Sequence, residues 1–134
     1  MIGLDTNVLV RYLAQDDAKQ AAQATRLIEK ELSATNPGFI STVVLAELCW
    51  VLARLYEAGQ TELVAMVSDL LDSHQFHLQH REAVQAAVRH MEQSSKKVGF
   101  VDVLVAQLAQ AEGCERTLTF DKAAARSAGM ALVG

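Results

Sequence analysis

Three acidic residues are each the only charged residue in a long, mostly apolar stretch of this chain. They are Asp5 within residues 1–10, Glu47 within residues 39–53 and Asp102 within residues 98–111. A fourth acid, Asp121, follows an apolar-leaning run that ends at Phe120. A carboxylate buried alone is costly, because loss of water disfavours its charged form. We therefore expect these acids to be buried and to share a cation, in a fold that brings distant segments together.

The size and charge of the chain limit what it can bind. Its 134 residues fit one domain, and a hydrophobic content of 51% is enough for a sizeable core. The net charge of −4 argues against broad duplex binding through a basic surface. It leaves open a nucleic acid that is held through a metal in an acidic pocket.

The N-terminus and the cysteines indicate a cellular compartment. Asp5 interrupts the N-terminus before any apolar segment builds up, so we expect no signal peptide. No window approaches the roughly 18 to 20 apolar residues of a membrane-spanning helix. Cys49 and Cys114 lie in separate apolar segments, and we expect small buried side chains in a reducing compartment, with a disulfide as the alternative. The chain is therefore expected to be cytoplasmic, without membrane contact.

Short apolar runs alternate with helical patterns along the chain. Strands are predicted at residues 2–5, 39–41, 76–78, 116–120 and 131–133. Helices are predicted at residues 6–13, 17–32, 42–57, 61–72, 82–91, 102–112 and 122–126, with Gly59 in the place of a helix C-terminal glycine. This alternation predicts an α/β domain over residues 1–134, in which helices cover both faces of a parallel sheet.

Two of the acids, Asp5 and Asp121, fall at the ends of predicted strands. Ligands of parallel α/β folds bind beyond the carboxyl ends of the strands, so these positions favour a site. Each acid also has a purely structural explanation. Asp5 and Asp121 could each cap the helix that follows, and Asp102 could lie in a first helical turn, where the helix dipole favours it. Both interpretations stay open for these three residues.

Glu47 has no such explanation, because it lies inside its predicted helix. Its neighbours three and four positions away are all apolar, and we expect Trp50 among them to belong to the core: Val43, Val44, Trp50 and Val51. Since no Lys or Arg lies between residues 31 and 53, its partner must come from elsewhere: a cationic side chain, a hydrogen-bond network or a metal.

Four carboxylates suit Mg²⁺ or Mn²⁺. Such an ion orients a water, lowers its pKa and neutralises charge on a phosphoryl oxygen, which indicates phosphodiester hydrolysis.

Four segments carry a family resemblance. The segments are residues 5–13 (DTNVLVRYL), residues 39–41 with 44–48 and 50–52, residues 100–106 (FVDVLVA) and residues 119–121 (TFD). In order and spacing they resemble the signatures of PIN-domain ribonucleases of the VapC toxin type.

The resemblance implies a three-layer α/β/α sandwich with a central parallel sheet, and Mg²⁺- or Mn²⁺-dependent endonucleolytic cleavage of RNA. It implies a metal-binding and catalytic quartet, with further residues lining or supporting the site: Asp5, Glu47, Asp102 and Asp121, then Thr6, Asn7 and Thr119. Arg11 is the best-placed phosphate contact, because it lies two helical turns from Asp5. The resemblance also implies a homodimer that is held inactive by a cognate antitoxin protein.

Two other functions remain as alternatives. A phosphatase with an aspartyl nucleophile also opens with a strand that ends in Asp, but its chemistry needs a second acid two residues later, where this chain has Asn7. A non-catalytic module that binds RNA or protein is also possible, although the complete quartet speaks against it.

Overall fold

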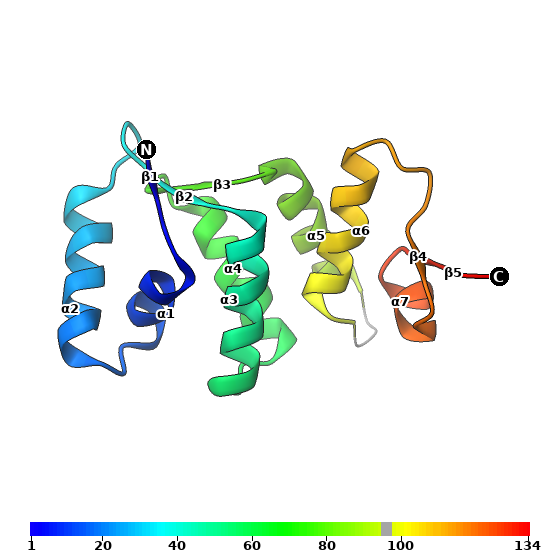
Figure 1. Ribbon diagram of the computed structural model, residues 1–134, viewed down its shortest axis with the longest axis horizontal. Helices are drawn as coiled ribbons and strands as arrows, with labels where there is room; N and C mark the ends of the chain where they lie inside the picture. The colour runs from blue at the N-terminus through cyan, green and yellow to red at the C-terminus, as the bar shows by residue number, and fades with distance from the viewer. Residues whose placement is uncertain (95–97) are drawn as a thin grey trace. The chain divides into compact units, whose positions relative to one another are not determined.

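The computed structural model describes residues 1–94 and 98–134. Within it the chain forms two compact units, each described here by itself. The first unit comprises residues 1–59 and 69–79, and the second comprises residues 60–68 and 80–134. Helix α4 (Gln60–Asp72) begins in the second unit and ends in the first. Figure 1 labels the helices and strands of both.

The first unit is built on a three-stranded parallel sheet. Its strands are β1 (Ile2–Gly3), β2 (Gly38–Ile40) and β3 (Phe76–Leu78), side by side in chain order. Gly38 pairs with Ile2 on one side and with Phe76 on the other. A Cβ at Gly38 would lie 2.6 Å from the Leu4 side chain and 2.9 Å from that of Leu32, so a glycine is needed where this strand meets the core.

Helices connect these strands in the way the parallel pairing requires. They are α1 (Thr6–Ala14), α2 (Ala18–Arg26) with its π-helical extension η1 (Leu27–Glu31), and α3 (Thr42–Leu55). Helix α1 contacts both α2 and α3 and lies between them (Figure 1). The starts of α2 and α3 are capped, because Asp17 accepts a hydrogen bond from the Gln20 amide at 3.0 Å and Ser41 accepts one from the Val44 amide at 3.1 Å.

The second unit contains a pair of packed helices and a small parallel ribbon. Helix α5 (Arg81–Gln93) packs against α6 (Phe100–Ala111), and the fully buried side chains of the two helices include Val84, Ala87 and Val103. Strands β4 (Leu118–Thr119) and β5 (Ala131–Leu132) pair in parallel, and α7 (Lys122–Ser127) connects them. The unit therefore carries its own parallel crossover, as the sequence pattern predicted.

Most predicted elements are present, with differences at their ends. The strand at residues 76–78 is confirmed at those residues, and the strand predicted at 116–120 shortens to Leu118–Thr119. Gly59 does not end α3. The helix ends at Leu55, and Glu57 takes the left-handed conformation with φ 57°, so a residue with a Cβ holds the position that glycine prefers.

The cysteines only partly follow the expectation. Both thiols are free, so the disulfide alternative is wrong. Cys49 is buried, as expected, but Cys114 is exposed, because it follows the end of α6 in the connection to β4 rather than a packed segment. Among the described residues, no helix is long and apolar enough to cross a membrane.

Replacing Glu57 by glycine should stabilise the protein. A side chain in the left-handed region costs about 1 kcal/mol or more, so we expect Glu57→Gly to raise the free energy of unfolding by roughly 0.5–1 kcal/mol in urea denaturation. The control Glu57→Ala removes the same charge but keeps the Cβ, and it should bring no such gain. Equal stability of the two variants would contradict the left-handed conformation of residue 57.

The two thiols should differ in reactivity. Burial raises the pKa of the Cys49 thiol to about 12, so at neutral pH it holds no nucleophilic thiolate. We expect iodoacetamide to modify Cys114 in the folded protein and Cys49 only after denaturation, as read by mass spectrometry of the labelled peptides. Rapid labelling of Cys49 under native conditions would show that α3 does not bury this face.

Candidate functional site

Asp5 stands at the junction of the first strand and the first helix. It follows β1 and occupies the N-cap position of α1, with φ −83° and ψ 159°. Its side chain makes no capping hydrogen bond, and it is exposed. Asp5 therefore holds the cap position that its structural explanation predicted, but its carboxylate makes no capping hydrogen bond. The carboxylate stays available at the carboxyl end of a strand of the parallel sheet.

The residue after Asp5 reaches across the first unit to Glu47. Thr6 begins α1 and is 4% exposed, and its hydroxyl donates a hydrogen bond to Oε1 of Glu47. The two residues are separated by 41 positions in the chain. This contact joins the start of α1 to the middle of α3. It places the glutamate carboxylate against the residue that neighbours Asp5.

The expectation that the four acids are buried is wrong. Each of them is exposed: Asp5, Glu47, Asp102 and Asp121. For Glu47 the reason lies in α3, which buries a different face through Leu45, Leu48, Cys49 and Leu52. The described partner of Glu47 is the Thr6 hydroxyl, and a further role for this carboxylate as a metal ligand stays a prediction.

Trp50 is also not in the core, contrary to expectation. It is 59% exposed, and the Arg54 guanidinium carbon lies 5.3 Å from the centre of its ring. Because α3 is apolar almost all round, the sequence alone does not reveal which of its faces meets solvent.

Arg11 is held by neighbours in the first unit. Its Nε donates to Gln20 at 2.8 Å, and its Nη1 lies 3.1 Å from Oδ1 of Asp16. The other oxygen of Asp16 accepts a hydrogen bond from Tyr56 at 2.6 Å, which lowers the pKa of the Asp16 carboxyl and raises the pKa of the Tyr56 hydroxyl. Sequence reasoning missed this network, since nothing in the local pattern marks Asp16 or Tyr56. A phosphate contact from Arg11 stays a prediction, as does a role for the exposed Asn7.

The second unit positions the other two acids at helix starts. Asp102 lies exposed in the first turn of α6, as its structural explanation predicted. Asp121 caps α7, since its Oδ1 accepts hydrogen bonds from the amides of Ala123 and Ala124 at 2.8 and 3.1 Å. The Thr119 hydroxyl accepts a hydrogen bond from the Asp121 amide at 3.0 Å. A cap that uses one oxygen leaves the second carboxylate oxygen of Asp121 for another partner.

The donor chemistry fits a hard divalent cation. All four predicted ligands are carboxylates, two in each unit, and Asp5 is not engaged in a cap. Oxygen ligands of this kind are those that Mg²⁺ and Mn²⁺ prefer. Within the described residues of either unit alone, no three His, Cys, Asp or Glu side chains gather as metal ligands. A site with all four acids must draw on both units, and their convergence stays a prediction.

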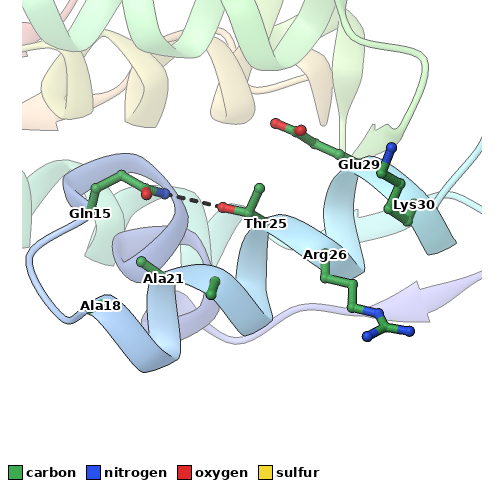
Figure 2. Close-up of a pocket in the computed structure, with 8 residues that line it drawn as sticks. Gln15, Ala18, Ala21, Thr25, Arg26, Glu29 and Lys30 are labelled. Carbon is green, nitrogen blue, oxygen red and sulfur yellow. Dashed lines mark hydrogen bonds between the residues drawn. The ribbon is translucent and has the colours of Figure 1, made fainter.

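The first unit also has a separate hollow on its surface. It is a shallow pocket of about 860 Å³ along α2 and η1, and a hydrogen bond of 3.2 Å from Gln15 to Thr25 crosses it (Figure 2). None of the predicted site residues lines it: the lining is Gln15, Ala18, Ala21, Ala22, Thr25, Arg26, Glu29 and Lys30. Small side chains and a mixed rim explain it as an ordinary surface hollow.

Parallel strands linked by helices define an α/β protein, and in each unit an acid follows a strand after one intervening residue: Asp5 follows β1 and Asp121 follows β4. The chain belongs to the PIN domain family, which matches residues 2–130. PIN domains have a three-layer α/β/α fold, so the predicted fold class is confirmed, and they are generally metal-dependent nucleases. A search of curated proteins finds no match to this chain.

The contact between Thr6 and Glu47 can be measured as a coupling energy. Because the acceptor is an exposed carboxylate, we expect the hydrogen bond to contribute about 1 kcal/mol. A double-mutant cycle of Thr6→Val and Glu47→Ala in urea denaturation should give that coupling. As a control, the cycle of Thr6→Val with Asp72→Ala, on α4, should be additive to within about 0.5 kcal/mol. Additivity in both cycles would mean that the hydroxyl and the carboxylate do not interact.

Proposed function

We propose that this chain is a Mg²⁺- or Mn²⁺-dependent endoribonuclease and the toxin of a toxin–antitoxin pair, with Asp5, Glu47, Asp102 and Asp121 as its catalytic acids. Its family, whose members are generally metal-dependent nucleases, supports the reaction class. The observation that carries the proposal is the hydrogen bond from Thr6 to Glu47, because it brings the acid of α3 to the residue beside Asp5.

The chain's own residues prepare the acids for this role. The Asp5 carboxylate makes no capping hydrogen bond to α1. Thr6 donates to Oε1 of Glu47, which leaves Oε2 of the glutamate to bind a cation. The Thr119 hydroxyl and the α7 amides hold Asp121 in place. When bound, a divalent cation supplies a water of lowered pKa and neutralises charge on the phosphoryl oxygens. Hydrolysis that releases the 3′-oxygen gives products with 5′-phosphate and 3′-hydroxyl ends.

The partners and compartment belong to the same proposal. A toxin of this type acts on cytoplasmic RNA as a homodimer and is inhibited by an antitoxin encoded beside it. Exposed apolar side chains such as Val105, 45% exposed in the second unit, support contacts with other proteins. Co-expression with the product of a neighbouring gene that encodes a short DNA-binding protein tests the antitoxin part.

A cleavage assay tests the enzymatic part. We expect the wild-type protein to cut an end-labelled single-stranded RNA in Mg²⁺ and to lose this activity with a chelator. Asp5→Asn, Glu47→Gln, Asp102→Asn and Asp121→Asn should each slow cutting by roughly 100-fold or more, because each removes a charge that holds the ion. The control Asp69→Asn, an exposed acid on α4 outside the quartet, should cut at the wild-type rate.

The products and the variants separate this proposal from its rivals. Products that end in a cyclic 2′,3′-phosphate would contradict metal-dependent hydrolysis. Hydrolysis of a simple phosphomonoester that survives Asp102→Asn would favour a phosphatase. RNA binding without any cutting, in Mg²⁺ and in Mn²⁺, would favour a non-catalytic module.

A further inference from the structure

One exposed stripe of α3 carries four residues of different chemistry. They recur at intervals of four, three and four positions, which places them on one side of the helix: Val43, Glu47, Trp50 and Arg54. All four are exposed, whereas the opposite side of the helix is buried. The candidate catalytic acid of this helix therefore lies directly beside an exposed tryptophan.

The tryptophan is arranged as an open aromatic surface. Its side chain is 59% exposed, and the Arg54 guanidinium lies 5.3 Å from the ring centre. This contact is a cation–π interaction, which fixes the arginine next to the indole. With a rise of 1.5 Å per residue, Trp50 lies about 4.5 Å and Arg54 about 10 Å along the helix axis from Glu47. An aromatic ring and a cation thus stand within one or two turns of the acid.

We propose that Trp50 and Arg54 form a binding platform for single-stranded RNA next to the hydrolytic site. An unpaired base stacks on the indole, and the guanidinium contacts a backbone phosphate. This inference rests on the proposed function, because it takes Glu47 as part of the hydrolytic site. It makes Trp50 and Arg54 substrate-binding residues and predicts a preference for unpaired RNA, since a base inside a duplex has no free face to stack.

The composition of the stripe favours RNA over a protein partner. A docking helix needs a continuous apolar surface, and Glu is depleted from protein interfaces, whereas Trp and Arg are enriched there, so the acid is the residue that argues against a protein partner. Here an acid separates Val43 from Trp50, and a cation follows. Stacking on one aromatic ring with an arginine beside it is the arrangement that single-stranded nucleic acid uses.

Trp50 is the only tryptophan in the chain, so its fluorescence reports on this position alone. The test uses the Asp102→Asn protein in Mg²⁺ with a short fluorescein-labelled single-stranded RNA, which a gel shows to remain intact. Tryptophan quenching, followed with the unlabelled RNA, should saturate at the same RNA concentration as fluorescein anisotropy. A duplex of the same sequence should quench little.

Variants then separate stacking from general apolar contact. Trp50→Leu keeps an apolar side chain but removes the aromatic face, and it should weaken RNA binding roughly 5- to 100-fold. Arg54→Gln should weaken binding and reduce the slope of log affinity against log salt by about one. The control Leu55→Ala removes an exposed side chain from a different face of α3 and should bind RNA as the parent does.

Several results would overturn the platform. These are no RNA binding by anisotropy, binding without quenching, or unchanged affinity in Trp50→Leu. If Trp50→Leu leaves RNA affinity unchanged but converts a dimer to a monomer in sedimentation, the stripe is a protein interface. The cleavage assay on the wild-type protein is read separately. Tryptophan quenching with weakened RNA binding by Trp50→Leu, but without any RNA cleavage, would contradict the nuclease proposal and support the platform. RNA cleavage without quenching would support the nuclease proposal and contradict the platform.

Discussion

The hydrogen bond from Thr6 to Glu47 is the constraint on which the candidate site depends. Among the residues that the structure describes, Thr6 is the only buried polar side chain. A buried hydroxyl needs a partner, because leaving it unpaired costs the free energy of its lost contact with water. Its partner is a carboxylate 41 positions away, so the start of α1 and the middle of α3 are fixed together. One acid of the quartet is thereby tied to the neighbour of another.

The positions of most strands and helices could be predicted from the sequence, but the buried face of α3 could not. Short apolar runs and helical spacing identified most strands and helices, because these signals act within a few residues. Ser41 was predicted to end a strand, and the structure shows that its side chain caps α3. The end of α3 was predicted near residue 57, with Gly59 as the terminating glycine, but the helix ends at Leu55 and Glu57 adopts the left-handed conformation. The prediction that Glu47 is buried was wrong, because its apolar neighbours Val43 and Trp50 are also exposed to solvent. Helical spacing shows which residues share a face but not which face packs.

The structural roles of the acids leave room for their proposed chemical roles. Asp121 caps α7 with one oxygen and keeps a second, and Glu47 accepts from Thr6 with one oxygen and keeps a second. A carboxylate can serve both roles, since each oxygen accepts hydrogen bonds or binds a cation independently. The two interpretations of each acid that the sequence left open, a helix cap and a metal ligand, are therefore compatible. Tertiary contacts such as the one between Thr6 and Glu47 leave no local trace, which is why only the structure reveals them.

Anomalous diffraction from a crystal grown with Mn²⁺ would show whether Asp5 and Glu47 share a metal ion. We expect a manganese peak within about 2–2.5 Å of an oxygen of Asp5 and of an oxygen of Glu47, with Thr6 still hydrogen-bonded to the glutamate. A fully occupied manganese elsewhere, or a Glu47 carboxylate more than about 10 Å from that of Asp5, would contradict it, because no ion can bridge such a gap at oxygen-ligand distances.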